Sequence, residues 1–314
     1  MSPNILILDG HAEIYRDRLR AEFPALEFLI AHKASELPAD ISDVDVLLSF
    51  AIELKDDFYR RATALKWIQC FATGVDHVLR CPSLGAGVIL TSGRGIHGPP
   101  MRETVVYLMM GVSRGVARLV ADQRAHIWER RFWSLFYGKT AVVAGTGIVG
   151  GAIGTLLKAF GMHVVGVSHA PRAAEGFDEM LPMERLRDAA RRADYLINVL
   201  PANAGNALLF DGAVFAAMKP TGYYISAGRG QTVDEPALVA ALRERRVAGA
   251  ALDVFQTEPL PADSPFWDLP NVFITPHLGG YIVEYEDLIM PLIVDNMRLF
   301  LAGRHGEMSN IVQH

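Results

Sequence analysis

Three glycines near the middle of the chain have the spacing of a phosphate-binding turn. Gly145, Gly147 and Gly150 lie in AVVAGTGIVG, between a predicted strand and a predicted helix. The first glycine permits the tight bend, the second lets the backbone approach a pyrophosphate, and the third lets helix and strand pack closely. A glycine-rich turn formed for backbone reasons alone is the alternative. We predict that a dinucleotide, whose phosphates the helix N-terminus would attract, contacts Gly145, Thr146, Gly147, Ile148, Val149 and Gly150.

The end of the next strand indicates which dinucleotide binds. An acid about 20 residues after the glycine turn would hold the ribose 2′-hydroxyl of NAD. The sequence there is VVGVSHAPR, with Ser168, His169 and Arg172 and no acid. These side chains can donate hydrogen bonds to a 2′-phosphate, which a carboxylate would repel, so the pattern favours NADP(H), with NAD(H) still possible. The alternative is that Arg172 is a solvated loop charge.

Four polar residues further along each follow a predicted strand. Arg229 lies in ISAGRGQTVDEPAL, Asp253 and Glu258 lie in AGAALDVFQTEPLP, and His277 lies in FWDLPNVFITPHLGG. Because the loops at the carboxyl ends of the strands line the ligand crevice of a doubly wound sheet, we expect these side chains to converge near the nicotinamide. Further predicted cofactor contacts follow strands of the same series: Leu200, Pro201 and Ala227.

A rival pattern is GVSRG, Gly111–Gly115, which matches the GxSxG elbow of serine hydrolases with Ser113 as nucleophile. Asp253 and His277 follow it in the order that such a triad needs. The prolines before this segment and its unbroken apolar pattern predict instead that Ser113 lies inside a helix.

The elements that must position these residues alternate between strand and helix, which implies an α/β fold with parallel sheets covered by helices. Strands are predicted at 4–8, 27–31, 44–49, 66–70 and 87–90, and then at 140–144, 163–168, 194–199, 222–226, 248–252 and 272–275. Helices are predicted at 12–22, 150–160, 235–246 and 284–301. Between the two series, prolines that a first helical turn tolerates precede 101–120, which we predict to be one long apolar helix suited to burial between domains or subunits.

Composition excludes several classes of protein. The length of 314 residues favours two domains, and the net charge of -5 offers no basic excess for nucleic acid. No apolar run reaches the roughly 18 residues of a membrane span, and the N-terminus does not resemble a signal peptide. Cys70 and Cys81 lack metal-type spacing, so no metal site is expected. Two free thiols in the cytoplasm are the simplest interpretation, and a disulfide in an exported protein is the alternative.

Taken together, the motifs resemble the D-isomer-specific 2-hydroxyacid dehydrogenases over nearly the whole chain. The matching segments are ATGVDHV, GTGIVG, AGRGQTVDE, ALDVFQTEPLP and TPHLGG. Within that family the chain is most similar to short glyoxylate/hydroxypyruvate reductases. The resemblance implies two Rossmann-like, doubly wound parallel-sheet domains, one flavodoxin-like and one dinucleotide-binding. It places a split substrate domain at 1–98 plus 287–314 and the NAD(P) domain at 99–286, with a crevice that closes on the reactants.

The resemblance also implies a role for each matching residue. Arg229 would hold the substrate carboxylate and polarise the keto oxygen, and His277 would donate a proton to that oxygen as hydride arrives. Glu258 would hydrogen-bond the imidazole and favour its protonated form. Asp253 would contact the nicotinamide carboxamide. The loop that would receive the substrate carboxylate is Ala72, Thr73, Gly74 and Val75.

Some residues depart from the family pattern. Ser226 replaces a common asparagine, and Asn203 and Asn206 stand where threonines are usual. Tyr281 and Tyr285 replace smaller residues, and at the mouth of the site they would change its size and polarity. Trp128 matches a tryptophan that reaches a neighbouring subunit's site in related reductases, and ordinary packing is the alternative.

The function that we expect is reduction of a small 2-keto acid by NAD(P)H to a D-2-hydroxy acid, in a homodimer. The alternative from another class is a non-catalytic, dinucleotide-gated interaction protein, such as the C-terminal binding proteins. The presence of all three catalytic residue types favours the enzyme.

Overall fold

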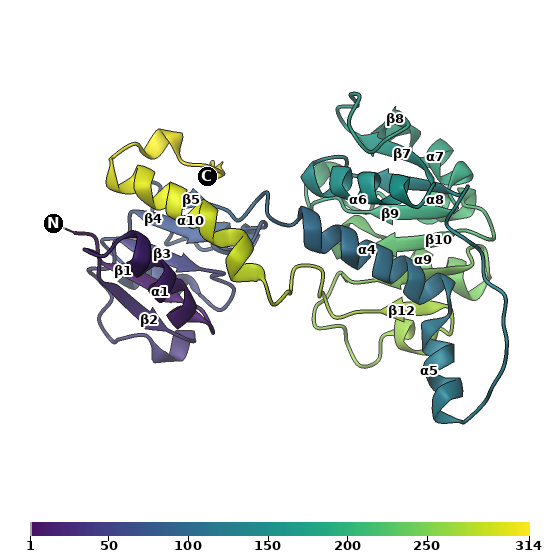
Figure 1. Ribbon diagram of the computed structural model, residues 1–314, viewed down its shortest axis with the longest axis horizontal. Helices are drawn as coiled ribbons and strands as arrows, with labels where there is room; N and C mark the ends of the chain where they lie inside the picture. The colour runs from purple at the N-terminus through teal and green to yellow at the C-terminus, as the bar shows by residue number, and fades with distance from the viewer. Residues whose placement is uncertain (1) are drawn as a thin grey trace. The chain divides into compact units, whose positions relative to one another are not determined.

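The computed structural model describes residues 2–314, and the chain divides into two compact units. Unit 1 comprises Met1–Ile96 and Ile282–His314, and unit 2 comprises His97–Tyr281. Unit 1 therefore contains both terminal segments, drawn in purple and yellow in Figure 1. The domain ends expected from the sequence, Gly98 and Glu286, lie two and five residues beyond the ends of the corresponding segments.

Unit 1 is built on one six-stranded sheet. Its strands are β1 (Ile5–Leu8), β2 (Phe28–Ala31), β3 (Val46–Ser49), β4 (Trp67–Cys70), β5 (Ile89–Thr91) and β13 (Ile311–Val312). The order is β13-β5-β4-β3-β1-β2, in which β13 is antiparallel to β5 and the other pairs are parallel. Its helices are α1 (Ala12–Glu22), α2 (Asp56–Arg61), α3 (Asp76–Leu79) and α10 (Tyr285–Leu301).

The strands of unit 1 are short apolar runs because both faces of the sheet are covered. Successive residues of β1 point to opposite faces. Ile5 and Ile7 join the buried cluster that includes Ile289 of α10, whereas Leu6 and Leu8 join the cluster on the other face.

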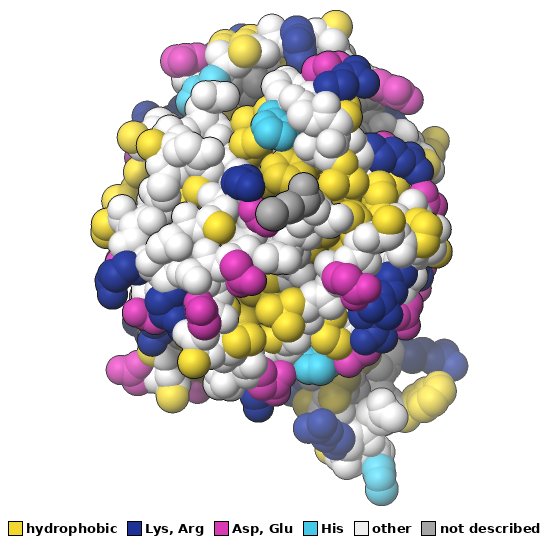
Figure 2. Space-filling model, turned by 90° about the vertical axis from the view of Figure 1, so that its left-hand side faces the viewer, with side chains coloured by type: hydrophobic (Ala, Val, Ile, Leu, Met, Phe, Trp, Pro, Cys, Tyr) yellow, Lys and Arg dark blue, Asp and Glu magenta, His cyan; other side chains and the backbone are white. Residues whose placement is uncertain are grey.

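The face of unit 1 that Figure 2 displays mixes basic and acidic side chains with apolar ones. Neither sign of charge forms a continuous patch on this face.

Unit 2 is built on a seven-stranded parallel sheet. Its strands are β6 (Thr140–Ala144), β7 (His163–Ser168), β8 (Glu179–Pro182), β9 (Tyr195–Asn198), β10 (Tyr223–Ser226), β11 (Gly249–Leu252) and β12 (Val272–Ile274). The order is β12-β11-β10-β9-β6-β7-β8, so the chain direction across the sheet reverses between β6 and β9. Its helices are α4 (Gly98–Ser113), α5 (Val116–Arg124), α6 (Ile148–Ala159), α7 (Leu186–Arg192), α8 (Gly212–Ala217) and α9 (Glu235–Arg243).

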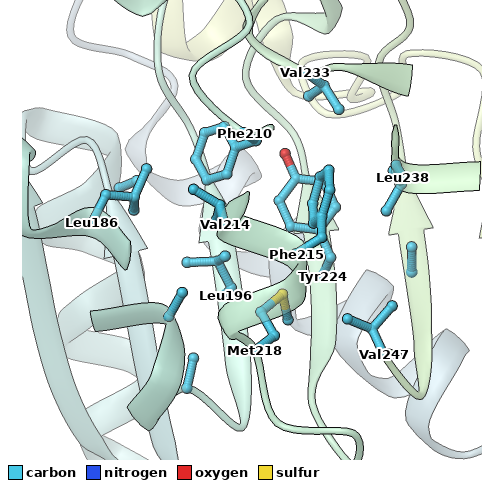
Figure 3. Close-up of a cluster of buried hydrophobic side chains, with 14 of the residues drawn as sticks. Leu186, Leu196, Phe210, Val214, Phe215, Met218, Tyr224, Val233, Leu238 and Val247 are labelled. Carbon is cyan, nitrogen blue, oxygen red and sulfur yellow. The ribbon is translucent and has the colours of Figure 1, made fainter. Parts of the chain in front are cut away.

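Helices cover both faces of this sheet. On one face α4 and α6 lie side by side, and Val105 and Ile153 join a fully buried cluster with Val143 of β6. On the other face α7, α8 and α9 pack against the strands in the cluster drawn in Figure 3, with Phe215 of α8 packed on Tyr224 of β10. Two α/β units with mainly parallel sheets confirm the expected fold class.

One long helix over 101–120 was a wrong prediction. The segment forms α4 and α5, which are bent by 60° at a break before Val116. Gly115 lies at this break with φ of 64°, a left-handed conformation that glycine adopts at little cost. Among the described residues no single helix is long and apolar enough to cross a membrane, although the bent pair meets that test when the two helices are taken together.

Candidate functional site

The glycine turn of unit 2 follows β6 at the reversal point of the sheet, where parallel α/β proteins bind ligands. Gly145 has φ of 102°, which excludes most other residues. A Cβ on Gly150 would lie 1.8 Å from the carbonyl oxygen of Gly145, so the turn closes only with glycine there. A Cβ on Gly147 would meet no atom within 4 Å, which leaves the backbone open to a ligand in front of α6. These residues fit the pyrophosphate of a dinucleotide.

The loops after β9 and β10 pack tightly beside this turn. A Cβ on Gly228 would lie 2.6 Å from the carbonyl oxygen of Leu200, so the predicted cofactor residues Leu200, Pro201 and Ala227 belong to two loops in backbone contact. The backbone N–H of Ala227 also bonds to the carbonyl of Asn198, at 3.0 Å.

Asn198, which the sequence analysis missed, organises the approach to Arg229. Its fully buried side chain donates to Thr232 Oγ1 at 2.7 Å, and that hydroxyl donates to the Arg229 carbonyl, also at 2.7 Å. Asn198 Oδ1 accepts from the Leu200 N–H at 3.1 Å. The signal in the sequence was a polar residue ending the apolar strand YLIN.

Arg229 itself is half-buried, and its guanidinium donates to the carbonyl of Gly228 at 2.8 Å. The next residue, Gly230, packs against the backbone of Phe255, since a Cβ there would lie 1.9 Å from the Phe255 carbonyl carbon. This contact brings the Arg229 loop against the loop that carries Glu258.

His277 and Glu258 form a hydrogen-bonded pair, with 2.7 Å between His277 Nδ1 and Glu258 Oε2. Glu258 Oε1 accepts from the Phe255 N–H at 2.9 Å. Burial, the strongest single influence, raises the pKa of Glu258. The hydrogen bonds from His277 and Phe255 and the charges of His277 and Arg229 outweigh burial, so the pKa lies below its ordinary value. Glu258 is therefore a carboxylate at neutral pH, available to stabilise a positive imidazole.

Asp253 fixes the loop that carries His277. It is only 1% exposed, and its Oδ1 accepts from Thr275 Oγ1 at 2.5 Å and from the Leu278 N–H at 2.8 Å. Its Oδ2 accepts from the Gly279 N–H at 3.0 Å. These bonds hold His277 at φ of 54°. The predicted contact of Asp253 with the nicotinamide carboxamide stays a prediction.

The residues predicted to meet the 2′-phosphate lie at the carboxyl end of β7, where Ser168 is the last residue of the strand, and in the loop after it. Ser168 Oγ accepts from the Ala170 N–H at 3.2 Å, which leaves the hydroxyl hydrogen free to donate. His169 Nε2 lies 2.7 Å from Asn206 Oδ1. Arg172 is exposed and makes no ion pair with any residue of 2–314. The same part of the chain contains no group of three or more metal-ligating side chains.

The predicted substrate loop lies in unit 1, where it follows β4. The Ala72 carbonyl accepts from the Gly93 N–H at 2.9 Å, Thr73 is exposed, Gly74 is half-buried and Val75 is buried. The loop is thus tied to the segment after β5.

The expectation that Tyr285 lies at the mouth of the site was wrong. Its ring is buried in the core of unit 1, and its hydroxyl donates to the Phe71 carbonyl at 2.7 Å, just before the predicted substrate loop. Tyr281 is 75% exposed in unit 2. Trp128 is 91% exposed, so ordinary packing within its own chain does not explain it.

The serine-hydrolase alternative was also wrong. Ser113 is the last residue of α4, and its hydroxyl donates to the Met109 carbonyl one turn earlier, at 2.6 Å. A nucleophile elbow needs a sharp turn between strand and helix, which this serine does not occupy.

The chain is similar to proteins of known families. Residues 106–279, more than half of the chain, match the family described as D-isomer specific 2-hydroxyacid dehydrogenase, NAD binding domain. D-3-phosphoglycerate dehydrogenase of Mycobacterium leprae is 33% identical over 86% of this chain and 51% of its own length. The chain thus spans about half the length of the D-3-phosphoglycerate dehydrogenases that it matches. Glyoxylate/hydroxypyruvate reductase B of Pectobacterium atrosepticum is 30% identical over 98% of this chain and 97% of its own.

Solved structures agree over nearly the full chain. A D-isomer specific 2-hydroxyacid dehydrogenase family protein of Aeromonas salmonicida has a TM-score of 0.91 and 31% identity, covering 99% of both chains. The NADPH-dependent glyoxylate/hydroxypyruvate reductase of Sinorhizobium meliloti, in complex with NADP and sulfate, has a TM-score of 0.84 and 27% identity over 99% of this chain and 98% of its own. The chain belongs to the D-isomer specific 2-hydroxyacid dehydrogenase family.

Proposed function

We propose that this protein uses NADPH to reduce a small 2-keto acid, of the glyoxylate or hydroxypyruvate type, to the D-2-hydroxy acid. The observation that carries the proposal is the 2.7 Å pair of His277 and Glu258, in loops of the same sheet that carries the glycine turn. Arg229 lies close enough for its charge to lower the pKa of Glu258.

The chemistry divides among these side chains. A bound nicotinamide supplies the hydride. Arg229 exchanges its bond to the Gly228 carbonyl for the substrate carboxylate, which a planar, permanently charged guanidinium binds well. His277 donates the proton on Nε2 to the keto oxygen, and Glu258 at Nδ1 stabilises the imidazolium before transfer and fixes its orientation. We propose that the loop Ala72–Val75 offers backbone N–H groups to the substrate.

The preference for NADPH rests on the residues at the carboxyl end of β7 and in the loop after it. Ser168, His169 and Arg172 can donate hydrogen bonds to a 2′-phosphate, and no acid lies among them to repel it. The Sinorhizobium meliloti reductase, solved with NADP, is a relative with this cofactor.

We also propose a homodimer. Large apolar side chains are exposed on α5 and on the segment after it, which a stable monomer would rarely leave in water. They are Leu119, Val120, Ile127, Trp128, Phe132, Trp133 and Leu135. Asp122, which pairs with Arg118 and Arg131, ties this segment back to α5. We propose that Trp128 reaches the partner's site, and that the protein is cytoplasmic, in keeping with its two unpaired cysteines.

His277→Ala tests the function. We expect turnover of glyoxylate or hydroxypyruvate to fall by about 100-fold or more, because general acid catalysis is removed, while the Kd of NADPH stays close to that of the wild type. Equal losses of turnover and NADPH binding would contradict the role of proton donor. Tight NADPH binding by the wild type without turnover of any 2-keto acid would favour the non-catalytic sensor.

A further inference from the structure

A hydrogen bond joins two loops that are far apart in the sequence. His169 Nε2 lies 2.7 Å from Asn206 Oδ1, across 37 positions of the chain. His169 is exposed directly after β7, whereas Asn206 is only 1% exposed and lies in the loop after β9. A buried amide therefore holds an exposed imidazole.

Asn206 is itself fixed by its own loop. Its Nδ2 donates to the Pro201 carbonyl at 3.0 Å, and its backbone N–H donates to the Asn203 carbonyl at 3.1 Å. Because the amide nitrogen faces a carbonyl, the amide oxygen must face His169, where it can only accept. His169 therefore carries a proton on Nε2. Its Nδ1 makes no hydrogen bond to any protein group within residues 2–314.

The position of this hydrogen bond relative to the strands of unit 2 connects it with the predicted cofactor site. The strand β6 lies between β7 and β9, and the glycine turn starts at its carboxyl end. The link from His169 to Asn206 thus joins the loops on either side of the glycine turn. It lies beside Ser168, whose hydroxyl hydrogen is free to donate.

We propose that Asn206 is a positioning residue that selects NADPH through His169. It holds the imidazole by Nε2 and leaves Nδ1 unengaged, so that the imidazolium form of the ring, in which both nitrogens carry a proton, can donate from Nδ1 to the 2′-phosphate beside Ser168 and Arg172. Asn206 need not touch the cofactor to do this. The inference rests on the proposed function, since it concerns the phosphate that distinguishes NADPH from NADH.

A double-mutant cycle tests this role. The Kd values of NADPH and NADH are measured by fluorescence titration for the wild type, Asn206→Ala, His169→Ala and the double variant. We expect the wild type to prefer NADPH and Asn206→Ala to lower that preference about five- to tenfold, which corresponds to the loss of one ordinary hydrogen bond. His169→Ala should lower it by at least as much, and the double variant should match His169→Ala. The affinity for NADH should change little throughout.

Two controls separate positioning from folding. Asn203→Ala changes an exposed asparagine of the same turn and should leave the preference intact. If Asn206→Ala fails to fold, Asn206→Ser takes its place in the cycle. The role of Asn206 is contradicted if its substitution lowers NADPH and NADH affinity equally, or lowers the preference equally with and without His169. Equal affinities in the wild type would contradict the NADPH assignment itself, and with it the role of Asn206.

Discussion

Substituting Glu258 by glutamine removes one charge and keeps the size of the side chain. In the wild type, Oε2 accepts from His277 and Oε1 accepts from the Phe255 N–H. Glutamine has one carbonyl oxygen for these two donors, and its NH₂ group can only donate. If that oxygen still accepts from the Phe255 N–H, the NH₂ group of the glutamine faces the N–H on His277 Nδ1. Two donors then oppose each other, which disfavours the imidazolium that must give up a proton.

The size of the effect follows from the geometry. Two unit charges about 4 Å apart attract by about 1 kcal/mol in water and about 4 kcal/mol at an effective dielectric constant near 20. His277 and Glu258 side chains are 43% and 36% exposed, so solvent screens them in part. We therefore take the stabilisation of the imidazolium that is lost in Glu258→Gln as about 2 kcal/mol from the charge and about 1 kcal/mol from the hydrogen bond. At 1.36 kcal/mol for each factor of ten, kcat should fall by about 100- to 200-fold.

The assay is NADPH oxidation at saturating glyoxylate or hydroxypyruvate, with NADPH binding measured separately. Glu235→Gln is the matched control. Burial raises the pKa of Glu235, and the nearby Glu258 charge raises it further, while its Oε1 accepts from the Gln256 N–H at 2.7 Å. We expect that control to keep kcat within about threefold, because the His277 pair is untouched. A Glu258→Gln enzyme with nearly wild-type kcat would refute the reasoning, as would equal losses in both variants.

Three further predictions concern the cofactor, the fold and assembly. Arg172→Asp should shift the ratio of the KM values for NADPH and NADH in favour of NADH by about tenfold or more, because a carboxylate repels the 2′-phosphate. Arg187→Asp on α7 makes the same charge change elsewhere in unit 2. An equal shift in that variant would show that Arg172 does not contact the 2′-phosphate. Gly150→Ala should destabilise unit 2 by at least about 2 kcal/mol in thermal unfolding, because its Cβ would lie 1.8 Å from the Gly145 carbonyl oxygen. Gly151→Ala, whose Cβ meets no atom within 4 Å, should be neutral or stabilising, and equal stability of the two variants would contradict the packing argument. Trp128→Glu with Phe132→Glu should convert a dimer to a monomer in light scattering, whereas Ile14→Glu on α1 should not; an unchanged mass for the double variant would exclude this surface as the interface.

Much of the fold could be predicted because, in many segments, the local pattern of apolar, capping and turn residues favours the same element that the segment forms in the folded chain. The run TAVVA before the glycines forms β6 over the predicted residues, and the Asp234 side chain caps α9 by accepting from the Ala237 N–H at 3.0 Å. The break between α4 and α5 was missed because Gly111 and Gly115, the two glycines of 101–120, are both compatible with a continuous helix. The edge strand β8 was missed because EMLP is short, begins with glutamate and ends in proline.

The site residues could be named from the sequence, but their connections could not. The distance between His277 and Glu258, and the use of both Asp253 oxygens by the His277 loop, depend on tertiary packing. The burial of Tyr285 was missed because the chain re-enters unit 1 at Ile282, earlier than expected. The contact of His169 with Asn206 joins two loops whose proximity depends on the order of the strands.

The most direct test of the proposed function is a panel of initial rates with the wild-type protein. Glyoxylate, hydroxypyruvate, pyruvate and phenylpyruvate would each be tested with NADPH and with NADH, and the configuration of each chiral product determined. We predict turnover of at least one small 2-keto acid, with NADPH preferred and a D-2-hydroxy acid wherever the product is chiral. Tight NADPH binding without turnover of any of the four acids, or an L-product, would contradict the proposal.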